Sequence, residues 1–147
     1  MTKNDLLFLI DIKLKPLGYQ KKGTSWYKEN SETITVFALD KSRWGEIYYV
    51  YLCVLFKDLS DDKRPKFYKC HSNIRVEHFG ENTEEYLNLE NNMDDKARKT
   101  RVGNLLDMAI SILNQEETVI GFKKLISKYN HDIFWLTDEA KKLLGID

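Results

Sequence analysis

The chain has 147 residues with 23 basic and 23 acidic side chains, and 42% of its residues are hydrophobic. Its 7 Phe, 8 Tyr and 3 Trp exclude a disordered protein. Its zero net charge excludes a strongly basic protein that is attracted as a whole to nucleic acid or to anionic membranes. Two cysteines are too few for a disulfide framework, and the apolar run 6–10 is too short for a signal segment or a membrane span. We therefore expect a single cytoplasmic domain over residues 1–147 with no membrane association.

The first predicted element is a helix over residues 4–14, because its apolar positions recur at helical spacing and Pro16 ends it. Four strands follow, over residues 24–28, 33–39, 47–56 and 68–76. The third of these has ten residues without a charge and is apolar at both parities. Such a strand is typical of a central position that is covered on both faces.

The fourth predicted strand is assigned its two faces by parity, because alternate side chains of a strand point to opposite sides. One face carries the apolar side chains Cys70, Ile74 and Val76. The other carries His71, Asn73, Arg75 and Glu77. We expect the first set to face the core, which directs the polar set away from it.

Residues 81–95 carry six acidic side chains and no basic one, which predicts a solvated internal connection. Three helices are predicted after it, over 94–114, from Thr118 to about residue 129, and from the N-cap Thr137 to Gly145. The basic cluster at the start of the first is interpreted as a solvated helix face; it comprises Lys96, Arg98, Lys99 and Arg101. One helix, four strands and then three helices predict an α+β fold with a mainly antiparallel sheet on which the helices pack.

Three motifs in this order resemble a bacterial family catalogued as the domain of unknown function numbered 4304. The first motif is Leu14-Lys15-Pro16-Leu17-Gly18-Tyr19, then Lys21-Lys22-Gly23 and Trp26-Tyr27. The second is Lys41-Ser42-Arg43-Trp44-Gly45 followed by Tyr48-Tyr49-Val50, and the third is Cys70-His71 with Arg75. The resemblance covers residues 5–80 well and the helical part in outline. It implies a small cytoplasmic α+β domain, and it brings no established activity or catalytic residue.

The sequence has no clear motif for a metal site, a cofactor site or a catalytic nucleophile. Cys70 and His71 are adjacent on a predicted strand and point to opposite faces, and Cys53 lies inside an apolar strand. No phosphate-binding glycine motif occurs in the chain. We expect no metal site, no cofactor, no catalytic residue and no intrachain disulfide, with Cys53 and Cys70 acting as small core side chains.

The most informative pattern is a set of aromatic and cationic side chains on and beside the predicted sheet. The candidate binding residues are Arg43, Trp44, Tyr49, Tyr51, His71 and Arg75. On one shared face they suit an anionic or planar ligand, or the acidic side chains of a partner. The alternative is structural: the tyrosines pack under the helices, and Arg75 pairs with Glu77 or Glu46.

Three functions remain open. The leading hypothesis is a non-catalytic module that binds, and regulates or neutralises, another protein. The alternative is a small enzyme that acts on an anionic molecule, with His71 as acid/base and Arg75 as anion clamp. The third is nucleic-acid binding through the basic loop 63–69, which the preceding Asp61 and Asp62 disfavour. The sequence leaves the oligomeric state and the partner open.

Overall fold

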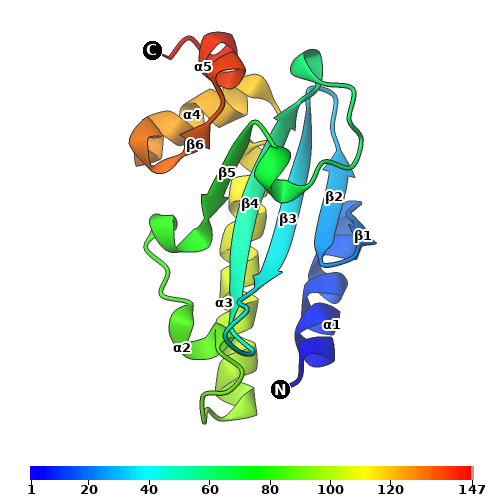
Figure 1. Cartoon of the computed structure of the whole chain (residues 1–147), viewed down its shortest axis with the longest axis vertical. Coiled ribbons are helices and arrows are strands. Elements are labelled where there is room, and N and C mark those ends of the chain that lie inside the picture. The colour runs from blue at the N-terminus through cyan, green and yellow to red at the C-terminus, as the bar shows by residue number, and fades with distance from the viewer. Residues whose placement is uncertain (147) are drawn as a thin grey trace.

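The computed structural model of the chain describes residues 1–146 and shows a twisted sheet with helices packed on one side (Figure 1). The strands are β1 (Gln20–Lys22), β2 (Ser25–Glu29), β3 (Thr33–Lys41), β4 (Tyr48–Phe56), β5 (Ser72–Arg75) and β6 (Trp135–Leu136). The α-helices are α1 (Lys3–Leu14), α2 (Glu84–Leu87), α3 (Asp95–Gln115), α4 (Val119–Tyr129) and α5 (Asp138–Leu144). The α+β class and the succession of a helix, a sheet and C-terminal helices are thus confirmed.

The sheet is an antiparallel meander in which spatial order follows chain order from β1 to β6. Its longest ladder joins β3 to β4 over nine residue pairs, from Thr33–Phe56 to Lys41–Tyr48. The β4 strand is interior, as its lack of charge predicted, and most of its side chains are buried on both faces. Antiparallel neighbours need no crossover, so successive strands pair whether the connection is short, as between β3 and β4, or long, as between β5 and β6, where residues 76–134 intervene.

The sheet has six strands, whereas the sequence predicted four. The strand β1 has three exposed polar or charged residues, and β6 has only two residues. Neither carries an alternation of apolar and polar side chains that a pattern search detects. Their backbone hydrogen bonds to β2 and β5 define them as short edge strands, which are less prone to pair with other chains than long ones.

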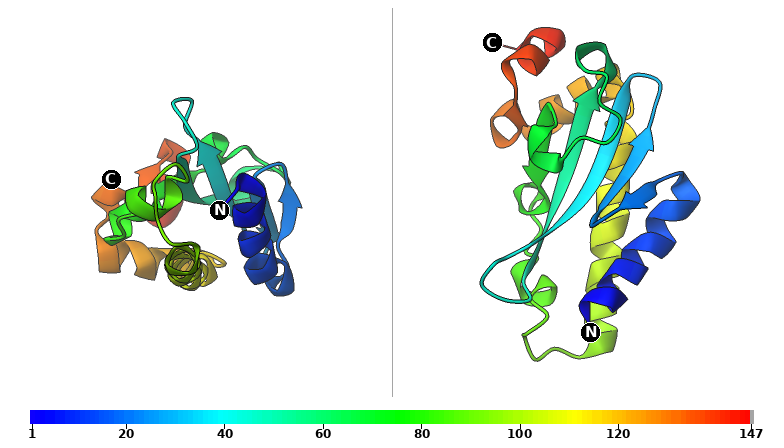
Figure 2. Two further views of the ribbon diagram at one scale, coloured as in Figure 1. Left: turned by 90° about the horizontal axis from the view of Figure 1, so that it is seen from below. Right: turned by 45° about the vertical axis from the view of Figure 1, so that its right-hand side comes forward.

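The main core lies between the inner face of the sheet and the helices. The right-hand view of Figure 2 shows these helices along one side of the sheet. Alternate residues of β4 enter it, including Val50, Leu52 and Val54. They meet the apolar stripes of α1, α3, α4 and α5. At one end, Phe122 of α4 makes edge contacts with the rings of both Phe56 and Phe134. Among the described residues, no helix combines the length and apolarity needed to cross a membrane.

A second, smaller cluster lies on the outer face of the sheet. Its buried members are Tyr27, Ile34, Val36, Ala38, Cys53, Leu55 and Cys70. Residues 57–71, which connect β4 to β5, cover part of this face, and the Tyr27 hydroxyl donates a hydrogen bond to the carbonyl of Pro65 at 2.9 Å. The double coverage of β4 that the sequence predicted therefore has helices on one side and a loop on the other.

The strand predicted over residues 68–76 is shorter in the structure, and its parity assignment is wrong at its start. A 3-10 turn occupies Phe67–Lys69, and β5 runs only from Ser72 to Arg75. The parity of a strand does not continue through such a turn. Cys70 consequently lies in the outer cluster instead of the main core, while Ile74 does enter the main core as predicted.

The acidic segment 81–95 is not simply a solvated connection, because it contains α2, whose Tyr86 and Leu87 are fully buried. The segment 81–95 also contacts the sheet through an isolated antiparallel β-bridge between Asn88 and Ile47. The interpretation of the basic cluster on α3 as solvated is wrong for one member. Arg98 is buried, and its guanidinium donates to the carbonyl of Asn91 at 2.7 Å.

Candidate functional site

The candidate site is the outer surface of β4, β5 and β6, because the ladder register gathers aromatic side chains there. Tyr51 is paired directly with Arg75, and Asn73 is paired with Trp135. Directly paired residues of antiparallel strands share a face, so these side chains lie on one side of the sheet. We call this surface the aromatic face; it comprises Tyr49, Tyr51, Phe67, Tyr68, Arg75 and Trp135.

The guanidinium of Arg75 is held between an aromatic ring and a carboxylate. Its Cζ lies 4.5 Å from the ring centre of Tyr49, and its Nε donates to Glu77 Oε2 at 2.9 Å. The Thr83 hydroxyl donates to the other oxygen of Glu77 at 2.5 Å. Burial acts to raise the pKa of Glu77, but the hydrogen bonds from Arg75 and Thr83 outweigh it and hold this pKa below its ordinary value. The carboxylate therefore stays charged and fixes the plane of the guanidinium.

A shallow hollow of about 200 Å³ lies at this position, and Tyr49, Arg75 and Glu77 form one wall of it. The other wall is Asn82, Thr83 and Glu84, at the start of α2. Both readings of Arg75 given by the sequence are thus present, since the side chain lies beside Tyr49 and is also paired with Glu77. The side chain of Arg75 remains 40% exposed in this pair, which leaves part of the guanidinium open to a partner.

Aromatic rings continue along the face from this point. The ring of Phe67 stacks on Tyr51 with their centres 4.7 Å apart, and Tyr68 meets Phe67 edge to face at 5.4 Å. Tyr68 is 54% exposed and Trp135 is 52% exposed. Sequence reasoning considered Phe67 and Tyr68 only as part of the nucleic-acid loop 63–69, and it missed Trp135. The register of β6 against β5 brings Trp135 here, and a two-residue strand gives no signal for it.

Arg43 and Trp44 lie in the turn between β3 and β4, and both are exposed. The indole of Trp44 is 85% exposed, the highest value among the exposed large hydrophobic side chains of the described residues. The backbone N–H of Trp44 donates to the Ser42 hydroxyl at 3.1 Å, which shapes the turn. This turn is an extension of β4 beyond the aromatic face, with no contact between Trp44 and the rings of that face among the described aromatic pairs.

The structure separates His71 from Arg75, contrary to the prediction that the two share a face. His71 is only 8% exposed, and its ring stacks on Phe56 with the centres 5.9 Å apart. Its Nδ1 accepts the backbone N–H of Phe56 at 2.8 Å, and its carbonyl accepts the N–H of Thr137. Burial lowers the pKa of His71, and the charge of Glu139 offsets this only in part. His71 thus bonds the end of β4 through its neutral ring and the N-cap of α5 through its backbone carbonyl, so a His71–Arg75 catalytic pair has no geometric basis.

We expect replacement of His71 by Leu to destabilise the fold by about 1–3 kcal/mol, because the buried N–H of Phe56 loses its acceptor. The pKa of His71 also gives the stability of the native chain a dependence on pH whose direction can be stated. Since the folded pKa of His71 is depressed below the ordinary 6.5, the unfolded chain takes up a proton first, and the contribution of His71 to stability is lost as the pH falls below about 6.5. Urea titrations from pH 7 to pH 5 check this, and His71→Asn, whose Oδ1 can accept the same N–H, should remove the acid-side loss. An identical pH profile for His71→Asn and the native chain would contradict the assignment.

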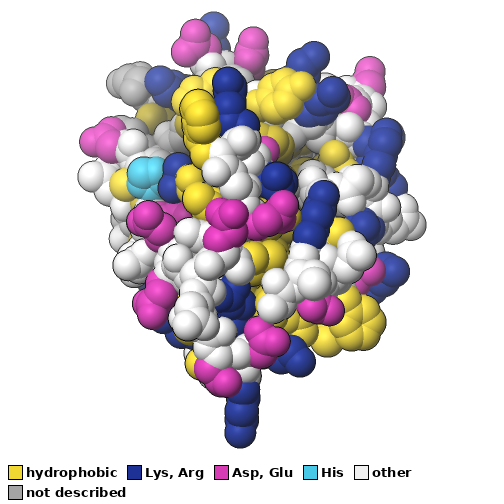
Figure 3. Space-filling view, turned by 60° about the horizontal axis from the view of Figure 1, so that its bottom comes forward, with side chains coloured by type: hydrophobic (Ala, Val, Ile, Leu, Met, Phe, Trp, Pro, Cys, Tyr) yellow, Lys and Arg dark blue, Asp and Glu magenta, His cyan; other side chains and the backbone are white. Residues whose placement is uncertain are grey.

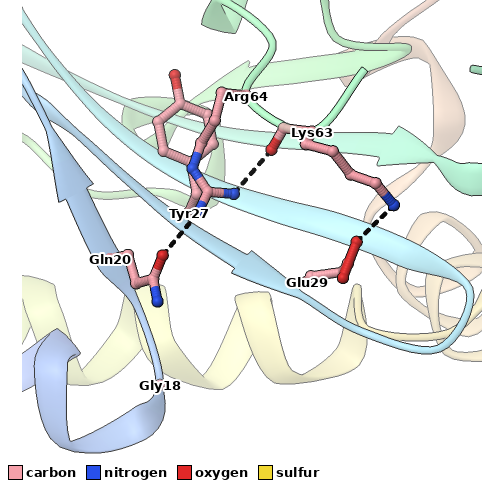
Figure 4. Close-up of a pocket in the computed structure, with 6 residues that line it drawn as sticks. All are labelled: Gly18, Gln20, Tyr27, Glu29, Lys63 and Arg64. Carbon is pink, nitrogen blue, oxygen red and sulfur yellow. Dashed lines mark hydrogen bonds and ion pairs between the residues drawn. The ribbon is translucent and has the colours of Figure 1, made fainter. Parts of the chain in front are cut away.

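A larger hollow of about 590 Å³ lies between β1, β2 and the loop that follows β4 (Figure 4). Its cationic groups are already engaged: Lys63 Nζ lies 2.7 Å from Glu29 Oε1, and Arg64 Nη2 donates to Gln20 Oε1 at 2.6 Å. The Arg64 guanidinium also lies over the ring of Tyr27, 5.4 Å from its centre. A nucleic-acid phosphate bound by Lys63 or Arg64 would have to displace these contacts, which weakens the nucleic-acid hypothesis for that half of the loop 63–69.

The two cysteines, Cys53 and Cys70, are buried free thiols of the outer cluster. Burial raises the pKa of the Cys53 thiol well above its ordinary value, and contact with Cys70 acts in the same direction. Such a thiol is a poor nucleophile at neutral pH. Within residues 1–146, no three His, Cys, Asp or Glu side chains are grouped so that they could hold a metal ion.

These observations define an α+β protein with an antiparallel meander, helices on the inner face and an open aromatic surface on the outer one. A family model described as Domain of unknown function (DUF4304) matches residues 10–136, and the chain belongs to this family. The match confirms the resemblance carried by the three motifs and extends it through α3 and α4 to β6. No curated protein and no solved structure matches the chain.

Proposed function

We propose that the chain acts as a single cytoplasmic domain, a non-catalytic protein-binding module that engages an acidic segment of a partner through the aromatic face. The observation that carries the proposal is the exposure of Tyr68 and Trp135 on the same sheet face as the guanidinium of Arg75. Tyr, Trp and Arg dominate the binding energy of protein interfaces, because they bury large areas at low entropic cost. The two free buried thiols suit a reducing compartment.

The charge around the aromatic face favours an acidic partner. Lys66 and Lys69 flank Phe67 and Tyr68, are exposed, and make no ion pair with any described residue. Glu77, the carboxylate nearest Arg75, is already neutralised by that guanidinium. Free cations beside exposed rings attract carboxylates and aromatic side chains of a partner. Regulation or neutralisation of the partner would follow from occupation of its acidic segment.

The proposal is tested by capturing the partner from cells that encode the chain and measuring its affinity for purified variants by calorimetry. We expect Trp135→Ala and Arg75→Ala each to weaken binding by more than about 1 kcal/mol. Because the Arg75–Glu77 pair is partly exposed, Arg75→Ala should cost less than about 1 kcal/mol of stability. Thermal melts of the same samples separate the two effects.

Ile120→Ala is the matched control, since Ile120 is an exposed apolar side chain on α4 and 65% accessible. It should leave the affinity unchanged. If Trp135→Ala and Arg75→Ala bind like the native chain, or if Arg75→Ala unfolds, the proposal is wrong. Binding that instead falls steeply with salt on an RNA or DNA probe and depends on Lys66 and Lys69 would assign the surface to nucleic acid.

A further inference from the structure

The helix α1 is apolar on two opposite sides, and only one of them is covered. Leu6, Ile10 and Leu14 are buried in the main core. Phe8 is 63% exposed and Ile12 is 51% exposed. At about 100° per residue these two lie on the side of the helix opposite to the buried stripe. Figure 3 shows hydrophobic side chains gathered at the lower right of the molecule, over α1.

The ends of the exposed stripe carry opposite charges, which within one copy also have local partners: Asp5 Oδ2 accepts the N–H of Thr2 at 2.9 Å, and Lys15 Nζ lies 3.2 Å from Asp11 Oδ2. Reading along it, the side chains are Asp5, Phe8, Ile12 and Lys15, with an acid at the N-terminal end and a base at the C-terminal end. Their spacing is symmetric about the middle of the helix, because each outer pair is three positions apart and the inner pair is four positions apart. In an antiparallel pair of identical helices, Asp5 of one copy therefore faces Lys15 of the other, and Phe8 faces Ile12.

The surface beside Phe8 is hollowed in the way that such a pairing needs. A largely apolar hollow of about 320 Å³ is lined by Phe8, Asp11, Ile12, Lys15 and Pro16. It has room for a phenyl ring, and the two-fold axis would place Phe8 of the second copy there, against Ile12. Because an isologous contact repeats itself, each copy supplies one ring and one hollow.

From the paired spacing, the end charges and the hollow, we infer that the occupant of this α1 face is a second copy of the chain, bound antiparallel across a two-fold axis. The surface lies on the helix side of the sheet, so the dimer leaves the aromatic face open. A contact centred on one helix buries less than the roughly 800 Å² per partner of a standard interface. We therefore expect a weak dimer with a dissociation constant of about 10–100 µM.

Sedimentation equilibrium of the full chain, up to about 1 mM, tests the association. The expected result is a monomer–dimer equilibrium whose dissociation constant rises about tenfold or more for Ile12→Asp, because the charge would be buried against Phe8 of the second copy. Ile120→Asp is the control, since Ile120 is at least as exposed as Ile12 but lies on α4. It should leave the dissociation constant unchanged. A native chain that stays monomeric, or a dimer that Ile12→Asp leaves intact, overturns the inference.

Cross-linking tests the antiparallel register. Phe8→Cys and Ile12→Cys chains of different tag length are mixed and mildly oxidised, and the native thiols Cys53 and Cys70 are shielded by full burial. The antiparallel pairing predicts that a disulfide joins the Phe8→Cys chain to the Ile12→Cys chain. Links formed mainly between two Phe8→Cys chains would show a parallel or unrelated contact and overturn the register.

Discussion

Glu116 should contribute a fall of about 3–4 kcal/mol in the stability of the chain between pH 5 and pH 8, and replacement of Glu116 by Gln should remove this contribution. Glu116 ends α3, is fully buried, and neither of its carboxyl oxygens has a hydrogen-bond partner among the described residues. Burial raises the pKa of Glu116 from 4.5 to about 8. The folded chain therefore holds a proton that the unfolded chain releases between these two values, so stability is present at low pH and is lost as the pH rises.

Guanidinium titrations at half-unit steps of pH give the free energy of unfolding that checks this. Glu117→Gln is the matched control, because the adjacent Glu117 is partly exposed and its carboxylate is paired with Lys28 at 3.2 Å. It should keep the native slope between pH 5 and pH 8. Because His71 contributes a slope of opposite sign below about pH 6.5, the comparison is made between variants and not on the native curve alone. A Glu116→Gln slope equal to that of the native chain would contradict the prediction.

The parts of the fold that the sequence predicted well are those in which one periodicity runs uninterrupted. The strand β4, with nine residues, and the helix α3 are long enough that the pattern of hydrophobic residues predicts which side chains are buried. The N-cap Thr137 was also predicted correctly, and Thr118, where the preceding helix was predicted to begin, is the N-cap of that helix; each accepts the backbone N–H of the third residue after it. Edge strands of two or three residues are defined by hydrogen bonds to a neighbour, which composition does not encode.

The candidate site was predictable only in part for the same reason. Tyr49, Tyr51 and Arg75 lie on regular strands, so parity placed them together correctly. His71 stands in the break between a 3-10 turn and β5, where parity has no meaning, and its backbone partners draw it to the end of β4. Trp135 joins the site from a sequence distance of about sixty residues, through a pairing that depends on how α4 returns the chain to the sheet.

Truncation of Arg98 to Ala should destabilise the protein by about 3 kcal/mol and release the acidic segment in particular. The buried guanidinium donates to the carbonyls of Asn88 and Asn91, and hydrogen bonds from a charged group contribute about 1.5–3 kcal/mol each. Loss of the side chain also leaves a cavity under α2. Amide exchange should therefore accelerate most between residues 83 and 92, where the N–H of Leu89 bonds to the carbonyl of Glu46.

Lys99→Ala is the matched control for Arg98, because it removes a positive charge from the next position of α3, where the side chain is exposed. It should alter neither stability nor exchange beyond about 0.5 kcal/mol. If the two variants behave alike, the effect comes from net charge and not from the buried contacts. The distinction matters because the segment 81–95 carries six acids and no base of its own, so α3 supplies the cations that hold it. Arg98 does so from inside, and Arg101 does so at the surface, through Glu85 at 3.0 Å and the ring of Tyr86.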